Sequence, residues 1–326
     1  MSSLLLLCLV YYAVLPFLHW AIWDAVWSGS SRESCHSEGA CWVFVTQNIE
    51  LFTYGFYPSE HRWRIHGVGL GWALSLLALR YVPTWTLRAW LALWIGTLLP
   101  YLSWKLLLGG VWLPSVETSQ WGGIFLTLVI AVIGIATSLP LGILLALGRR
   151  SQWLSLRLFA TLFIEVWRGV PLITVLFMSS VMFPLFFPEE WVVDKLLRAL
   201  MAVALFSSAY MAEVIRGGLQ AVPRGQLEAA STLGLSSVQS TVLIVLPQAI
   251  QKVVPAILNS FIALFKDTTL VSIIGMFDIL GVVQSASAHP DWLGYSLEGY
   301  LFVGFFYWSL CFAMSRSSKR LERQAS

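Results

Sequence analysis

Two neighbouring ionisable residues lie deep inside an apolar stretch, where they are placed to bind a small polar solute. Lys266 and Asp267 follow about a dozen helix-favouring residues from Val254, which at about 1.5 Å per residue puts them roughly 18 Å along a helix, near mid-membrane. A charge at that depth costs about 2.5 to 3.5 kcal/mol on insertion scales, so both residues are functional candidates. Thr268 and Thr269 can bond backbone groups that a helix break would free, and broken helices at mid-membrane commonly bind zwitterions.

A second polar group interrupts apolar sequence farther upstream. Glu165 and Arg168 are three positions apart, so on a helix they either neutralise each other or line a solute pathway, and both interpretations stay open. Gly169 and Pro171 flank Val170 and weaken the helix, because glycine is flexible and proline lacks a backbone donor. We therefore expect a second loosened segment at a similar depth.

Signals for covalent, metal or nucleotide chemistry are missing from the sequence. A phosphate-binding loop needs Gly-x-x-x-x-Gly-Lys followed by Ser or Thr, and no lysine here follows a glycine. Neither a paired acid and base nor a nucleophile motif is found, which disfavours an intramembrane enzyme. The spacing of four histidines suits no metal site; these are His19, His36, His61 and His66. We expect no catalytic residue, metal or cofactor in this chain, and a net charge of +3 gives no indication of nucleic-acid binding.

The composition shows which elements must position these residues. Hydrophobic residues make up 58% of the 326 positions and charged residues 11%, whereas a soluble domain carries about 25% charge. The solvent is therefore a lipid bilayer, and apolar runs near the ~20 residues of a spanning helix predict an all-α, polytopic membrane protein. The eight expected spans cover residues 4–22, 65–82, 88–108, 121–147, 157–187, 196–216, a broken segment 250–286, and 297–316.

Basic residues orient the expected spans. Twelve of the 20 lysines and arginines fall at alternate span ends, and cytoplasmic loops are enriched in these residues. Both termini are therefore predicted to lie in the cytoplasm. Polar residues near 115–121 divide an accessory membrane region of three spans, residues 1–114, from a core of five spans, residues 115–326.

The loop assigned to the periplasm, residues 23–64, is large enough to form a small cap over the membrane region. It contains Cys35 and Cys41, and an oxidising periplasm permits a disulfide between them. Sequence spacing does not establish the geometry that a disulfide needs, so a bonded pair and two free thiols both stay open.

The longest loop assigned to the cytoplasm, residues 217–247, carries the most specific spacing in the chain. It reads Glu228-Ala229-Ala230, three residues, Gly234, nine residues, and Ile244-Val245-Leu246-Pro247. Pro223 suits a first helical turn and Gly234 a left-handed cap, so we expect a helix of about ten residues outside the membrane, its alanines facing a partner. The residues expected to couple the chain to this partner are Gly225, Gln226, Glu228, Ala229, Ala230, Gly234 and Pro247.

This spacing resembles the EAA loop of ABC-importer permeases, which forms the coupling helix that docks on a cytoplasmic ATPase. Three further segments resemble the polar amino-acid branch of these importers, and in the first of them Val170 replaces the usual threonine. They are Glu165 to Leu172, Ala209 to Gly218, and Lys266 to Leu270. With its three additional N-terminal spans, the chain is similar to the longer permease of general L-amino-acid importers.

The resemblance implies a multi-pass protein of the bacterial inner membrane that imports L-amino acids, broadly polar or neutral, from periplasm to cytoplasm by alternating access. It also implies a heterodimer with a related permease, two ATPase subunits that bind ATP and Mg, and a periplasmic amino-acid-binding protein. In the resembling family the Lys-Asp segment and the position seven residues before the aspartate, here Ser260, line the substrate pocket. Importers of cationic amino acids tend to carry Glu there, so we expect Ser260 and Asp267 to bind substrate without a strong cationic preference.

Two alternatives stay open beside this interpretation. The chain is either a permease of the same class for another small polar solute, or a coupling scaffold whose partner permease alone carries the substrate pocket. A passive channel is disfavoured, because it would not need the coupling motif.

Overall fold

The computed structural model describes residues 10–35, 38–82, 84–110, 113–188 and 193–325. Helices dominate, and no strand forms within these ranges, so the all-α prediction is confirmed. The α-helices are α2 (Leu15–Leu18), α3 (Val43–Gln47), α4 (Ile49–Tyr54), α5 (Trp63–Tyr81), α6 (Trp85–Leu93), α7 (Leu99–Leu108), α8 (Gly123–Arg149), α9 (Leu154–Gly169), α10 (Leu172–Phe177), α11 (Lys195–Gln220), α12 (Arg224–Thr232), α13 (Ser237–Ser240), α14 (Leu246–Asp267), α15 (Ile279–Ser287) and α16 (Ser296–Ala325).

Five segments in the described part of the chain are long and apolar enough to cross a membrane, and a bent helix pair makes up to six. The five are Thr86–Leu108, Gly123–Arg149, Lys195–Gln220, Ser237–Ile274 and Ser296–Lys319. The expected count of eight is not reached, because α5 is not among them and the first expected span lies partly outside the described residues. The expected broken segment 250–286 is broken between Ile274 and Ile279, where Gly275 adopts a left-handed conformation (φ 72°), and the span before this break begins at Ser237.

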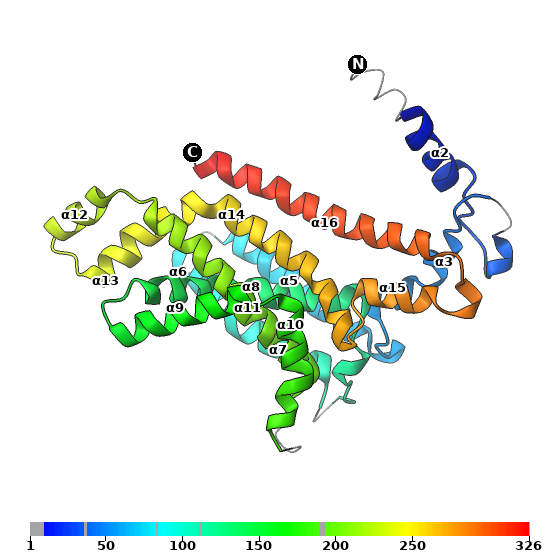
Figure 1. The fold of residues 1–326 in the computed structure, drawn as a ribbon, viewed down its shortest axis with the longest axis horizontal. Helices are drawn as coiled ribbons and strands as arrows, with labels where there is room; N and C mark the ends of the chain where they lie inside the picture. The colour runs from blue at the N-terminus through cyan, green and yellow to red at the C-terminus, as the bar shows by residue number, and fades with distance from the viewer. Residues whose placement is uncertain (1–9, 36–37, 83, 111–112, 189–192, 326) are drawn as a thin grey trace.

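The long helices α8, α11, α14 and α16 run along the long axis of the molecule in Figure 1. Small residues let α11 pack closely against α8 and α14. Ala209 and Ala212 of α11 are fully buried, and a Cβ added at Gly142 of α8 would lie 2.7 Å from the Met211 side chain. One end of this bundle carries α12 and α13, and we call it the α12 end. The described residues of the range 24–62, which include α3 and α4, are called the cap, and the end of the molecule where they lie is called the cap end.

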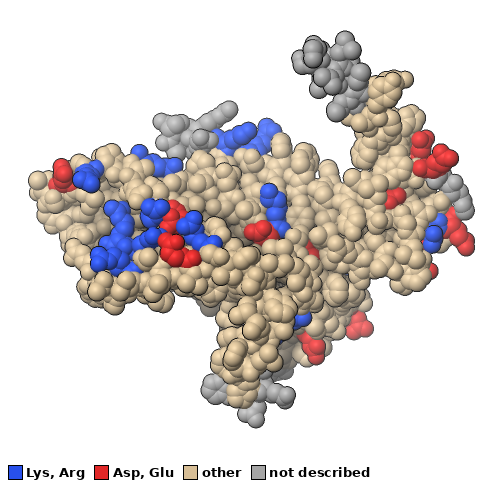
Figure 2. Space-filling model, in the orientation of Figure 1, with Lys and Arg blue, Asp and Glu red and all other residues tan. Residues whose placement is uncertain are grey.

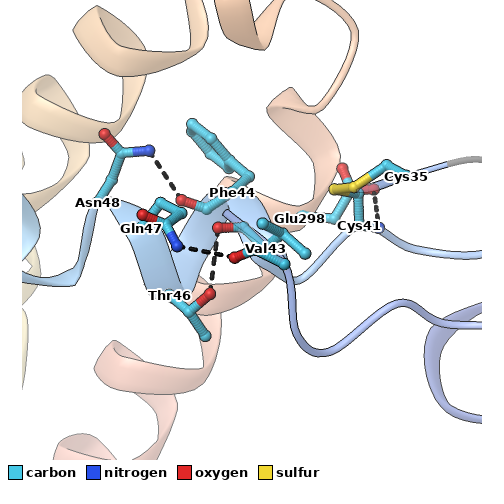
Figure 3. The surroundings of a disulfide bond; sticks show 9 residues. Cys35, Cys41, Val43, Phe44, Thr46, Gln47, Asn48 and Glu298 are labelled. Atoms are coloured by element: carbon cyan, nitrogen blue, oxygen red, sulfur yellow. Dashed lines mark hydrogen bonds between the residues drawn. A yellow bond between two sulfur atoms is a disulfide. The ribbon is translucent and has the colours of Figure 1, made fainter. Parts of the chain in front are cut away.

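The cap is fixed to the start of α16. Cys35 and Cys41 are disulfide-bonded with their Cα atoms 5.7 Å apart. The backbone N–H of Cys41 donates to the carboxylate of Glu298 at 2.9 Å, and Glu298 is buried (Figure 3). Phe44 of α3 packs on Trp292, with ring centroids 5.5 Å apart. The cap therefore covers the turn that joins α15 to α16.

Candidate functional site

A cavity of about 250 Å³ lies between α8, α11 and α14. Ser260 and Asp267, which the sequence predicted to share a site, both line it and lie two turns apart on α14. Ser138 of α8 and Ser207 and Tyr210 of α11 complete its polar lining, and these three were not predicted. The serine and tyrosine of α11 are three positions apart on one helix face, but only the packed structure shows which face meets α14.

The side chains of Asp267 and Ser260 can still accept hydrogen bonds from a molecule in the cavity. In the described part of the chain, Asp267 has no ion-pair partner within 4.0 Å, although its side chain is partly buried. The Ser260 hydroxyl donates to the Ala256 carbonyl at 3.0 Å, so its oxygen can still accept a hydrogen bond. The cavity therefore suits a small molecule with a positively charged donor.

The sequence predicted a helix break at the two threonines, and the structure has a change of helix type there instead. There α14 gives way to a 3₁₀ helix, Thr268–Ile274. The hydroxyls of Thr268 and Thr269 each donate to the carbonyl three residues earlier, at 2.8 and 3.0 Å. Neither threonine lines the cavity. Thr268 is buried and lies 3.1 Å from the Tyr307 hydroxyl, so it ties the end of α14 to α16 instead of facing solute.

Five charged residues form a cluster toward the α12 end, which we call the charge cluster. Glu213 is its centre and lies 2.6 Å from Arg149, 2.7 Å from Arg216 and 3.7 Å from Arg168. Glu165 pairs with Arg149 at 2.9 Å, so the pair that sequence spacing allowed between Glu165 and Arg168 does not form. Figure 2 shows acidic and basic side chains intermixed on one face of the molecule, toward the α12 end. The cluster joins α8, α9 and α11.

The segment after the charge cluster bends sharply. Helix α9 ends at Gly169, and its axis makes an angle of 102° with the segment from Leu172 to Phe186. Arg168 reaches back toward the cavity, because its guanidinium lies 5.6 Å from the ring centroid of Tyr210. Gly169 and Pro171 therefore stand at a helix break, as expected, but the cavity lining does not include them.

The other residues of this segment also lie outside the cavity. Val170 lines a separate apolar groove between α9 and α11. Glu165 and Arg168 lie in the charge cluster, and neither lines the cavity.

We expect Glu213→Gln to destabilise the protein more than Glu165→Gln. Glu213 is 15% exposed and compensates three arginines, so its loss leaves excess positive charge between helices. The cost should be about 1 to 3 kcal/mol, below that of a fully buried pair because the arginines are partly exposed. Glu165 is 56% exposed, and its replacement should cost less than about 1 kcal/mol. Thermal unfolding of the purified variants measures both, and equal shifts would contradict the central role of Glu213.

Helix α12 forms where the sequence predicted it. Pro223 precedes its first residue, Arg224, and the left-handed Gly234 (φ 78°) follows its end. The helix lies beyond the long helices, at one extremity of the molecule (Figure 1). Pro247 is exposed and occupies the first turn of α14, where a missing backbone donor is tolerated.

The faces of α12 differ in part from the prediction. Gly225, Glu228 and Ala229 are exposed, but Ala230 is 1% exposed and packs within this chain, so only one of the two alanines faces outward. Gln226 is exposed, and its side-chain oxygen accepts from Gln248 of α14 at 3.3 Å, which joins α12 to α14.

Two apolar side chains that the sequence reasoning did not single out extend the exposed face of α12. Leu233 is 78% exposed and Val238 is 72% exposed. The residues around them in the sequence are polar, so no periodic apolar pattern indicated that these two side chains belong to a surface. Exposed apolar side chains beside a short helix are typical of a protein-binding surface.

Apolar spans around a small cavity with a few polar side chains, and an exposed helix at one end, are typical of a membrane permease that engages another protein. Residues 138–326 match the family described as the binding-protein-dependent transport system inner membrane component. The chain belongs to this family.

Two relatives and one solved structure match much of the chain. It is 50% identical over 317 residues to the inner membrane amino-acid ABC transporter permease protein YhdY of Escherichia coli, covering 97% of this chain and 86% of that protein. It is 36% identical to the glutamate/glutamine/aspartate/asparagine transport system permease protein BztC of Rhodobacter capsulatus, covering 92% and 84%. A crystal structure of an amino acid ABC transporter with histidines matches with a TM-score of 0.54 at 30% identity, over 62% of this chain and 92% of that one.

Proposed function

We propose that this chain is the permease of an ABC importer that moves L-amino acids, broadly polar or neutral, across the bacterial inner membrane. The observation that carries this proposal is the cavity that Asp267 and Ser260 line. Its volume of about 250 Å³ is below the range of about 300 to 1,000 Å³ typical of drug-sized ligands. It therefore suits a small solute, and relatives that match most of the chain are named amino-acid permeases.

The chemistry of the cavity matches a free amino acid. The Asp267 carboxylate accepts hydrogen bonds from the substrate ammonium, because that carboxylate has no ion-pair partner within 4.0 Å among the described residues. The hydroxyl of Ser207, which makes no hydrogen bond among the described residues, donates to the substrate carboxylate, and the Ser260 oxygen accepts from the ammonium. The proposed transport requires no covalent step in this chain.

The partners follow from the exposed surfaces and the family. ATPase subunits, two per importer, hold ATP and Mg and dock on α12 with its neighbours Leu233 and Val238. A related permease completes the translocation pathway as a heterodimer, and a periplasmic amino-acid-binding protein delivers substrate at the cap end. Closure of the ATPases on ATP moves α12, and the pathway alternates between outward and inward access.

The orientation rests on the basic residues. Arg149 and Arg150 end α8, and Arg224 begins α12, so the α12 end carries clustered positive charge. Cytoplasmic surfaces of membrane proteins are enriched in such residues. We place the α12 end and both chain termini in the cytoplasm, and the disulfide-bonded cap in the periplasm.

The substrate class is tested by thermal stabilisation of the purified importer. L-amino acids are expected to raise its unfolding temperature, whereas sugars and di- or tripeptides at equal concentration are not. Stabilisation by one of those other solutes, without any by amino acids, would show that the cavity serves another polar solute.

We expect Ser260→Glu to shift selectivity toward cationic amino acids. The new carboxylate would join Asp267 in the same cavity and pair with an arginine or lysine side chain. One charge-assisted contact of about 1.4 kcal/mol changes the selectivity ratio about tenfold. Competition of arginine and of a neutral amino acid for uptake measures this ratio.

Asn259→Glu is the matched control for this prediction. Asn259 is exposed, neighbours Ser260 on α14 and does not line the cavity, so its replacement should leave the ratio unchanged. A Ser260→Glu protein with the wild-type selectivity ratio would show that this position does not discriminate between substrates by the charge of their side chains.

A further inference from the structure

An apolar groove of about 550 Å³ lies beside α11, on the side where α9 bends into α10. Its walls are carbon-rich, with Val166 and Trp167 from α9, Met178 and Phe186 from the segment after the bend, and Leu205 from α11. Several of these side chains are open to the surroundings: Val166 is 60% exposed and Phe186 is 75% exposed. In a bilayer such a groove faces lipid or another membrane helix.

The one charged residue of the groove lining is Arg198, on the first turns of α11. Arg198 is 7% exposed, and its Nη1 donates to the carbonyls of Ser180 and Ser179, at 2.7 and 3.5 Å. Its buried Nε has no hydrogen-bond partner. Carbonyl oxygens carry only partial charge, so they orient the guanidinium without neutralising it.

No carboxylate compensates Arg198 within the described residues. It takes part in none of the ion pairs, which require a distance of 4.0 Å or less. Asp194 is close in sequence, but its oxygens accept from the Leu197 backbone and from the Thr118 hydroxyl. A buried arginine without a counter-ion is costly, so the groove favours a bound anion beside Arg198.

The position of Arg198 along α11 indicates which anion that is. With 26 residues, α11 is about 39 Å long, whereas the hydrocarbon layer is about 30 Å thick. Placed symmetrically across this layer, α11 extends about 4.5 Å, or three residues, beyond it at each end, which puts Arg198, the fourth residue, at the boundary between headgroups and hydrocarbon. Leu205 lies about 10 Å deeper, so the groove runs from phosphate depth into the acyl chains.

We propose that this groove binds one anionic phospholipid, with its phosphate at Arg198 and an acyl chain along α11. One lipid molecule supplies both the negative charge at the rim and the apolar chain below it. A helix of a partner subunit would have to carry a carboxylate into the membrane boundary to do the same, at a cost of its own. The lipid seals the angle between α9 and α10, and the proposal does not depend on which solute the permease carries.

Native mass spectrometry of the full-length chain, purified with its associated subunits, tests the proposal. The probes are phosphatidylglycerol and phosphatidylcholine with identical acyl chains, added to delipidated protein. The wild type should bind phosphatidylglycerol about tenfold more tightly, because both lipids carry a phosphate but only phosphatidylglycerol has a net negative charge that compensates Arg198. Equal affinities in the wild type would overturn the proposal without recourse to any variant.

Three variants test whether Arg198 causes the preference for phosphatidylglycerol. Arg198→Gln should bring the two affinities within about twofold of each other, and Arg198→Lys, which keeps the charge, should retain a measurable preference. Lys195→Gln is the control, because Lys195 is an exposed cation one turn earlier on α11 and outside the groove lining. An undiminished preference in Arg198→Gln, or release of another membrane subunit in place of lipid, would assign the groove to a different occupant.

Discussion

Replacing Glu228 by arginine is expected to lower ATP-driven uptake more than about a hundredfold while the membrane part of the chain stays folded. Glu228 is exposed on α12, and its carboxylate takes part in no ion pair among the described residues. The change should cost the fold little, since surface substitutions usually alter stability by less than about 0.5 kcal/mol. At an interface, however, losing one partner of a buried charge contact costs about 2 to 5 kcal/mol, and reversal adds repulsion.

Uptake, ATPase activity and co-purification of the ATPase, measured together, separate the outcomes of Glu228→Arg. Either the ATPase is lost during purification, or it stays bound and hydrolyses ATP without transport. Gln251→Arg is the control, because Gln251 is exposed near the start of α14 and off the α12 surface. A Glu228→Arg protein with normal uptake would show that α12 does not transmit force through this residue.

Asp267→Asn is expected to reduce uptake about ten- to hundredfold, mainly through a higher KM. The substitution keeps the size of the side chain but removes the charge that holds the substrate ammonium. A hydrogen bond to a charged group contributes about 1.5 to 3 kcal/mol, which corresponds to this range. Initial uptake rates over a series of substrate concentrations measure the change in KM and in maximal rate separately.

Two companion variants interpret the Asp267→Asn result. Asp267→Glu keeps the charge and should retain part of the uptake, whereas Thr269→Val removes a hydroxyl outside the cavity and should leave KM near the wild-type value. If Asp267→Asn left KM unchanged, the substrate pocket would belong to the partner permease and this chain would act as a coupling scaffold.

Local signals in the sequence determined the parts of the site that were predicted well. The bounds of α12 follow from Pro223 and Gly234, whose backbone preferences act within one helical turn. Ser260 and Asp267 share a cavity because they are two turns apart on one helix, which sequence spacing alone indicates. The bend after α9 likewise follows from Gly169 and Pro171.

Contacts between separate helices account for the parts that were not predicted. Glu165 and Arg168 have the spacing of a pair, but Arg149 and Glu213 from neighbouring helices lie closer to them. Ala230 resembles Ala229 in sequence, yet only the packing of α12 on the adjoining segment shows that it is buried. These choices depend on how helices are rotated against one another, which the order of residue types does not specify.

The attachment of the cap depends on contacts still farther apart in the chain. The sequence allowed a bond between Cys35 and Cys41 and left it open, and the structure contains that bond. The hydrogen bond from Cys41 to Glu298 spans 257 positions, and no local pattern near either residue indicates the other. A glutamate within an apolar span indicates that its side chain needs a polar partner, but it does not indicate which residue that partner is.

Uptake by the reconstituted importer tests the central claim most directly. This chain, a related permease, the ATPase subunits and the amino-acid-binding protein would be placed in liposomes and supplied with Mg-ATP and a labelled L-amino acid. We predict accumulation that requires ATP and the binding protein and that Glu228→Arg abolishes. Absence of ATP-dependent accumulation for every amino acid that the binding protein holds, in vesicles where all subunits are assembled, would contradict the assignment of this chain as an amino-acid permease.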